Sequence, residues 1–271
     1  MKRRTFIKSM IFHSGMLAFG SYNLSAAPHN AIKILMVYNN AGDDGDYIKK
    51  WGLSTWIEQN NDAVLFDTGK NPKVLWRNIL RSGIDIQKLS KIVISHNHKD
   101  HINGLPILLK KLKSSPKVIV PHAALKKIKS KYPQADISGI KGPVQINNYL
   151  WSTGEMFASH PWGGSISEQS MIISQNNSML LLTGCAHPGV VNIAKKAIIQ
   201  HDKKKLDLVC GGFHLMDHTK QQILEISSDL KKLNVLSIAP SHCTGKVATN
   251  VFMDEWKERY MNFTLGQSLK I

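Results

Sequence analysis

The stretch Ser95-His96-Asn97-His98-Lys99-Asp100-His101 follows directly on an apolar run, Lys91–Ile94, that is typical of a buried strand. It holds four potential metal ligands, which are His96, His98, Asp100 and His101. The whole chain has 12 histidines in 271 residues, so three of them within six positions are not expected by chance. The sequence therefore predicts a metal site at the end of this strand.

The spacing of these ligands indicates how they would share metal ions. In extended backbone, side chains two residues apart point the same way, so His96 and His98 can bind one ion. Where the chain turns into the next helix, Asp100 and His101 point in another direction and could serve a second ion. Imidazole and carboxylate ligands without cysteine suit zinc, manganese or iron. We expect one or two divalent metal ions per chain, with zinc as the first expectation.

Short β-branched runs alternate with amphipathic segments on both sides of this stretch. The runs that predict strands are Ile32–Val37, Ser54–Ile57, Ala63–Phe66, Lys91–Ile94, Lys117–Val120, Val144–Ile146, Tyr149–Ser152, Glu155–Ala158, Ser170–Ser174, Met179–Thr183, Leu206–Val209, Val235–Ala239 and a last one near Phe263–Leu265. The segments that predict helices are Pro72–Arg81, Gly104–Leu112, Ala123–Tyr132, Val190–Gln200, Thr219–Leu233 and Val247–Tyr260.

This alternation predicts two strand-rich blocks, each followed by helices, with no Pro/Gly/Ser-rich linker between them. An apolar content of 42% is ordinary for a packed core. We therefore expect one α+β domain over residues 31–271, built as a four-layer αββα sandwich of two facing sheets with helices outside each.

The first residues have the pattern of an export signal rather than of a folded element. Three basic residues at positions 2–4 precede a modest apolar stretch, and small residues follow at Ser25-Ala26-Ala27. The run Arg3-Arg4-Thr5-Phe6-Ile7-Lys8 resembles the twin-arginine signal that exports folded proteins in bacteria. We predict that residues 1–27 are a signal peptide and that the protein is exported to the periplasm.

The chain is strongly basic, with a formal net charge of +16 at pH 7. Such a charge favours acidic partners, among them small anionic molecules, nucleic acid and anionic lipid. The lysines are dispersed and are not interleaved with the aromatic residues on which a single-strand binder stacks bases. No run of about 18 uncharged apolar residues occurs. We expect a small anionic substrate, no obligate nucleic-acid partner and no stable membrane insertion; the oligomeric state stays open.

Further motifs carry a resemblance to a known family. The His-x-His-x-Asp-His run after a strand, with Phe66-Asp67-Thr68-Gly69 before it, resembles the metallo-β-lactamase superfamily. Four other segments resemble the branch typified by dihydropterin ribofuranosyl-aminobenzene phosphate synthase. They are Gly52-Leu53-Ser54, Thr183-Gly184-Cys185-Ala186-His187-Pro188-Gly189, Gly211-Gly212-Phe213-His214-Leu215 and Pro240-Ser241-His242-Cys243-Thr244-Gly245. The resemblance extends over about residues 31–271, in the right order.

The resemblance implies a role for each matching residue. The first metal ion would be bound by His96, His98 and His187, and the second by Asp100, His101 and His242. Asp67 would keep the site in shape through hydrogen bonds to a ligand. Asp67, Asp100 and His214 are the residues that we expect to serve catalysis. His160, in His160-Pro161-Trp162-Gly163-Gly164, is a weaker candidate.

Cys185 departs from the pattern of the superfamily. Many members place an aspartate that bridges the two ions after a Thr-Gly or Ser-Gly pair, whereas Cys185 follows Thr183-Gly184 here. If Cys185 takes that place, the ions lose their shared carboxylate, and the second site is weaker, differently tuned or compensated by His214. The alternative, which is the usual role of a cysteine, is a small buried residue beside the site. With Cys210 and Cys243 the number of thiols is odd, so at least one stays unpaired.

The resemblance implies an enzyme, a metal-dependent hydrolase or related transferase. Bound zinc lowers the pKa of its water to about 7, so the site would offer a metal-activated hydroxide to a small anionic substrate, such as a phosphoester or a pterin phosphate. Two alternatives remain open. One is an exported metal-containing binding or sensor protein without turnover, which the Cys185 departure motivates. The other is a nuclease, which the positive charge permits.

Overall fold

Two β-sheets face each other in the part of the chain that the computed structural model describes, residues 31–42, 45–159 and 164–271. The first sheet has seven strands in the order β15-β1-β2-β3-β4-β5-β6. The second has six strands in the order β14-β13-β12-β11-β8-β7, and β9 and β10 form a separate two-stranded ribbon. The predicted signal peptide and His160 lie outside the described residues.

The strands of the first sheet are β1 Lys33–Tyr38, β2 Ser54–Gln59, β3 Asp62–Phe66, β4 Leu89–Val93, β5 Lys117–Pro121, β6 Ile137–Ile140 and β15 Ser268–Lys270. Those of the second sheet are β7 Val144–Asn147, β8 Leu150–Ser152, β11 Met171–Gln175, β12 Ser178–Thr183, β13 Leu206–Gly212 and β14 Val235–Ser241. The ribbon consists of β9 Met156–Ser159 and β10 Ser165–Glu168.

The α-helices are α1 Pro72–Ser82, α2 Lys99–Ile102, α3 Leu105–Lys111, α4 His122–Lys131, α5 Val190–Gln200, α6 Lys220–Lys232 and α7 Lys246–Trp256. Short 3₁₀ helices occupy Ile86–Lys88, His242–Thr244 and Lys257–Arg259. Among the described helices we find none with the length and apolar character that a membrane crossing requires.

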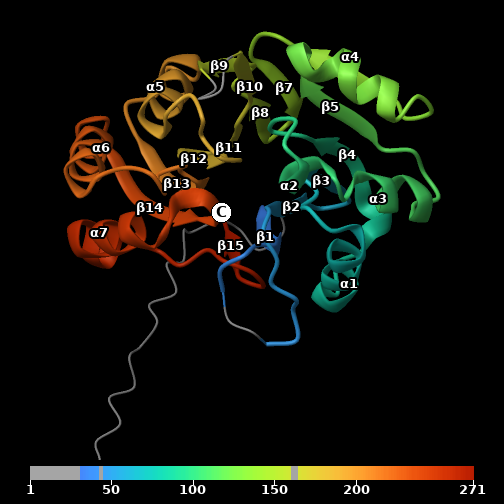
Figure 1. Ribbon diagram of the computed structural model, residues 1–271, viewed down its shortest axis with the longest axis horizontal. Helices are drawn as coiled ribbons and strands as arrows, with labels where there is room; N and C mark the ends of the chain where they lie inside the picture. Colours follow the sequence, from blue (N-terminus) through green and yellow to red (C-terminus); the bar gives the residue numbers. More distant parts are fainter. Residues whose placement is uncertain (1–30, 43–44, 160–163) are drawn as a thin grey trace, which may run out of the picture.

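Alternating side chains on the strands build a core on each side of both sheets. In β3, Val64 and Phe66 join the cluster between the two sheets, whereas Ala63 and Leu65 join the cluster under the helices. Because both faces are covered, such strands are apolar throughout. Figure 1 shows α1, α3 and α4 outside the first sheet and α5, α6 and α7 outside the second. The predicted four-layer αββα sandwich is confirmed.

Most of the predicted elements are found, and the exceptions have identifiable causes. Helix α5 has the predicted bounds, Val190–Gln200. The strand predicted near Phe263–Leu265 is wrong, since the last strand is β15, Ser268–Lys270, antiparallel to β1. Phe263 and Leu265 are buried, but their side chains fill the core from a turn with Gly266 at φ 81°. Strands β6 and β10 match no predicted run because their sequences are rich in serine and glycine.

The parallel strands bring several chain segments to one edge of the sandwich. Strands β3 and β4 run parallel in the first sheet, and β12, β13 and β14 run parallel in the second. The carboxyl ends of parallel strands meet at the same edge of a sheet. The loops after these five strands carry Asp67, His96, Cys185, His214 and His242, so this edge holds the candidate site.

Candidate metal centre

Asp67 anchors the histidine-rich loop that follows β4. Its Oδ1 accepts a hydrogen bond from the Ser95 backbone N–H at 2.7 Å, and its Oδ2 accepts one from Ser95 Oγ at 2.7 Å. The same carboxylate lies 2.6 Å from His101 Nδ1. Burial opposes a charge on His101, but the neighbouring Asp67 carboxylate outweighs this and raises the pKa of His101 to about 9. Asp67 therefore orients His101 so that Nε2 faces away from it.

His96, His98 and His187 form a first ligand group. His96 Nε2 lies 3.0 Å from His98 Nδ1, and the ring of His187 lies 4.6 Å from the ring of His96 between centroids. One ligand atom from each of the three residues lies within 4.8 Å of the others. Burial and the neighbouring imidazoles lower the pKa of His98 to about 4, with His187 the largest of the charged contributors. Imidazoles whose nitrogens converge in this way are suited to share a metal ion.

Asp100, His101 and His242 form a second ligand group. Asp100 Oδ2 lies 3.4 Å from His242 Nε2 and 3.7 Å from His101 Nε2. His242 Nδ1 faces Asn40 Oδ1 at 2.7 Å, which leaves Nε2 for a ligand. Burial opposes charge on Asp100, yet the nearby imidazoles of His242 and His101 hold its pKa well below the ordinary range.

One buried atom shows that the second group fits a cation. His242 is only 4% exposed, and its Nε2 is buried without a hydrogen-bond partner. Buried ring nitrogens in folded proteins are almost always bonded, so such an atom calls for an explanation. A metal ion held by Asp100, His101 and His242 would supply the missing partner, and the donor set of two imidazoles and one carboxylate suits zinc, manganese or iron.

Glu168, at the end of β10, is a functional residue that sequence reasoning missed. Its carboxylate is buried and accepts hydrogen bonds from the backbone N–H groups of Cys185, Ala186 and His187, each at 2.8 Å. It also lies 2.7 Å from His187 Nδ1, so His187 Nε2 is directed to the first ligand group. No sequence pattern marks Glu168, because three of its four partners are backbone groups.

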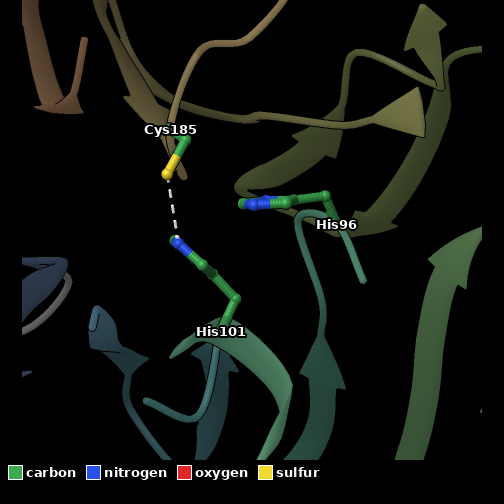
Figure 2. A group of neighbouring side chains, drawn as sticks. All are labelled: His96, His101 and Cys185. Atoms are coloured by element: carbon green, nitrogen blue, oxygen red, sulfur yellow. Dashed lines mark hydrogen bonds between the residues drawn. The ribbon is translucent and has the colours of Figure 1, made fainter. Parts of the chain in front are cut away.

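Cys185 lies between the two ligand groups. Its Sγ is 3.2 Å from His101 Nε2, and Figure 2 shows this contact with the ring of His96 alongside. Cys185 is 3% exposed, and all three cysteines of the chain are free thiols. The two sequence interpretations, a shared ligand or a small buried residue beside the site, are therefore both compatible with its position.

His214 stands at the rim of the centre. It has a left-handed backbone at φ 52°, and its ring lies 4.3 Å from that of His187 between centroids. A hydrogen bond to Cys243 raises the pKa of His214. His214 is exposed, whereas the ligand candidates are buried or half-buried, which suits a residue that faces substrate. Its catalytic role remains a prediction.

A hollow of about 730 Å³ opens beside His242. Its lining includes Trp51, Met216, Lys246 and Tyr260. The rings of Trp51 and His242 lie 4.9 Å apart between centroids, so an apolar wall stands next to the second ligand group. Lys246 adds a positive charge at the same place. The hollow thus offers an aromatic surface and a cation next to the candidate metal centre.

The comparisons with known proteins agree with this geometry. A sequence model described as "Metallo-beta-lactamase superfamily" matches residues 52–164, which include both His96 and Asp100. Over these residues the chain is similar to the metallo-β-lactamase superfamily. The αββα fold and the run of ligands after β4 both agree with this superfamily, as the resemblance predicted. Most proteins of the superfamily are metal-dependent hydrolases and related enzymes, and the fold generally binds divalent metal ions, for which this chain has two groups of candidate ligands.

Three known proteins are similar to this chain over most of their length. The 7,8-dihydropterin-6-methyl-4-(beta-D-ribofuranosyl)-aminobenzene-5'-phosphate synthase of Methanocaldococcus jannaschii is 27% identical, over 85% of this chain and 93% of that protein. The crystal structure of Tm1679, a metal-dependent hydrolase of the beta-lactamase superfamily, has a TM-score of 0.72 at 24% identity. The match covers 89% of this chain and 99% of that chain. The crystal structure of Zn²⁺-bound PqqB from Methylobacterium extorquens has a TM-score of 0.59 at 9% identity. The match covers 88% of this chain and 100% of that chain.

Proposed function

We propose that this protein is a metal-dependent hydrolase or related transferase that acts on a small anionic substrate, such as a phosphoester or a pterin phosphate. The observation that carries the proposal is the convergence of two ligand groups at one edge of the sandwich, with the orphaned His242 Nε2 in the second. Divalent zinc is the metal that we propose first, because its ligands are predominantly imidazoles.

The residues around the ligand groups have separate tasks in this proposal. A divalent metal ion, when bound, lowers the pKa of a water molecule and polarises an ester or phosphoryl oxygen. Asp67 orients the His101 ring through its contact with His101 Nδ1, and Glu168 orients the His187 ring through its contact with His187 Nδ1. His214, at the exposed rim, is placed to exchange a proton with a leaving group. Asp100 is both a ligand and a negative charge close to the reacting atoms.

The surroundings of the centre support the choice of substrate class. The net charge, +16 for the full chain and +12 without the four positive charges of residues 1–27, attracts anions to the protein, and Lys246 places one cation in the hollow beside His242. Trp51 in the same hollow provides a face for a planar group. The name of the Methanocaldococcus jannaschii relative describes a pterin-containing phosphate, which combines these two features.

The proposal is tested with a panel of substrates, comprising phosphomonoester, phosphodiester, lactone, thioester and β-lactam, each with and without added Zn²⁺ or Mn²⁺. We expect metal-dependent turnover of a phosphoester. His98→Ala and Asp100→Ala should each lose bound metal and activity together. His122→Ala, at an exposed surface histidine, is the matched control and should retain both. Full activity in both ligand variants would refute the proposal.

A second candidate function is a metal-containing binding or sensor protein without turnover. Cys185 favours it, because this residue stands where many members of the superfamily use a carboxylate. The same panel distinguishes the two functions. A protein that carries its metal ions and turns over none of the five substrate classes would favour binding alone.

We further propose that the protein is exported to the bacterial periplasm through its twin-arginine-type signal at residues 1–27. The replacement of Arg3 and Arg4 by lysine should retain the full-length protein in the cytoplasm of the cell that expresses it. The measurement is cell fractionation followed by mass spectrometry of the N-terminus. Unchanged periplasmic protein in the double variant would refute this assignment.

A further inference from the structure

We propose that the thiolate of Cys185 is the ligand shared by the two metal ions, in the place where other members use a carboxylate. This inference rests on the metal centre of the proposed function. It goes further because it assigns a sulfur ligand to a centre that otherwise contains only nitrogen and oxygen. The consequences are a distinct spectroscopic signature and a distinct metal preference.

The position of Cys185 between the groups is the first observation. One ligand atom from each of His96, His101 and Cys185 lies within 4.8 Å of the others, and these two histidines belong to different ligand groups. Their ring centroids are 4.1 Å apart, so the two groups are adjacent at this point. A sulfur atom that faces both groups is in the position that a shared ligand requires (Figure 2).

The contact with His101 is the second observation. His101 Nδ1 is held by the Asp67 carboxylate, so Nε2 is the ring nitrogen that faces Cys185 Sγ, at 3.2 Å. In a tetrahedral zinc site, typical Zn–S and Zn–N bond lengths place sulfur and nitrogen about 3.6 Å apart. A shift of a few tenths of an ångström would therefore turn this contact into two bonds to one ion.

The backbone around Cys185 is fixed, which is the third observation. The Glu168 carboxylate accepts hydrogen bonds from the backbone N–H groups of Cys185 and of the two residues after it. Gly184 packs so closely against Ser95 that a Cβ at Gly184 would lie 2.3 Å from Ser95 Oγ. The sulfur is thus pre-positioned between the ligand groups.

A neighbouring thiol provides the competing assignment. Cys243 Sγ lies 3.6 Å from the Cys185 carbonyl oxygen, and Cys185, His214 and Cys243 also form a group of ligand atoms within 4.8 Å. An ion in that group would have two sulfur ligands and would lie away from His96. Variants of the three cysteines separate the two assignments.

The test uses the full chain, stripped of metal with a chelator and reloaded with Co²⁺. A cobalt–thiolate bond produces an intense near-ultraviolet charge-transfer band, and nitrogen and oxygen ligands do not. We expect this band in the wild-type protein, in Cys243→Ala and in Cys210→Ala. Cys210 is the matched control, because it is a buried thiol in the core between the sheets. The band should be lost in Cys185→Ser and in Cys185→Asp.

Metal content gives a second readout that does not depend on activity. Cys185→Ser should weaken binding of the second ion by about tenfold or more. Cys185→Asp should restore two ions per chain and shift the preference from Zn²⁺ towards Mn²⁺, because carboxylate is the harder ligand. Circular dichroism of each variant establishes that it is folded.

Each result has a defined meaning. Two bound cobalt ions without the band in the wild-type protein would overturn the inference and leave the proposed function intact. Loss of the band in Cys243→Ala would also overturn it, since the ion would then lie with Cys243 and His214. A wild-type chain that binds no cobalt at all would refute the proposed function itself.

Discussion

Glu168 shows how much of the candidate site depends on groups that bind no metal. Its carboxylate accepts hydrogen bonds from three backbone N–H groups and faces His187 Nδ1. Glu168 therefore fixes both the loop after β12 and the orientation of the His187 ring. Burial opposes its charge, but the hydrogen bonds and the charge of His187 outweigh burial and lower the pKa of Glu168 to about 2. The charged form is therefore the one that the fold stabilises.

Glu168→Gln should destabilise the protein by about 1–3 kcal/mol at pH 7, because the amide nitrogen would face the N–H groups of His187. The folded pKa of Glu168 lies below its ordinary value of 4.5, so its contribution is complete above about pH 4.5 and declines as pH falls towards about 2. The difference in unfolding free energy between wild type and variant should therefore shrink by roughly 2 kcal/mol between pH 7 and pH 3.

Urea unfolding at both pH values measures this difference. Glu225→Gln is the matched control, because this exposed glutamate on α6 contacts only Gln221 among the described hydrogen bonds. It should change stability by less than about 0.5 kcal/mol. An equal effect of Glu168→Gln at pH 7 and pH 3 would contradict the assigned role of the charge.

Residues near in sequence could be predicted, and residues near only in space could not. The spacing of His96, His98, Asp100 and His101 indicates a metal site from local geometry alone. The family resemblance assigned His187 and His242 to the centre, and their positions at predicted strand ends agreed with it. Glu168 and Asn40 escaped prediction because they act on ring nitrogens and backbone groups. A single sequence gives no sign of such contacts.

At the scale of elements, the alternation of strands and helices was predictable wherever a segment buries one regular face. Helix α5 has the predicted bounds because its apolar residues follow the helical period. The last strand was placed wrongly at Phe263–Leu265, since buried apolar side chains need not belong to a strand. Edge strand β15 instead has only half-buried or exposed side chains, so its sequence lacks the signal of a core strand.

The junction between α2 and α3 is an element-scale feature that the site requires. Gly104 stands at this junction, and a Cβ there would lie 1.9 Å from the Thr68 carbonyl oxygen, one residue after Asp67. Gly104→Ala should therefore displace the segment that carries Asp67 and destabilise the protein by about 1–3 kcal/mol. The apparent affinity for Zn²⁺ should fall as well, because Asp67 orients His101.

Thermal unfolding and zinc titration check this prediction. Gly142→Ala is the control, because a Cβ at Gly142 meets no atom within 4 Å. It should leave both the melting temperature and the zinc affinity close to those of the wild type. Unchanged zinc affinity in Gly104→Ala would show that the loop tolerates the displacement.

At the scale of the whole molecule, the centre lies where the two halves of the sandwich meet. Asp67, His96, His98, Asp100 and His101 follow strands of the first sheet, whereas His187, His214 and His242 follow strands of the second. An ion shared between such ligands links the two sheets, in addition to the apolar cluster between them. Metal binding should therefore contribute to the stability of the complete fold.

Removal of the metal with a chelator should lower the melting temperature, and Zn²⁺ should restore it. At a free zinc concentration one hundredfold above Kd, the linkage contributes about 2.7 kcal/mol. For a protein of this size that corresponds to a rise of roughly 5–10 °C, measured by differential scanning calorimetry. The double variant His98→Ala/His101→Ala, which removes one ligand from each group, should show little of this rise. His218→Ala, outside both groups, should retain it. An equal rise in the double variant would place the stabilising ions elsewhere on the protein.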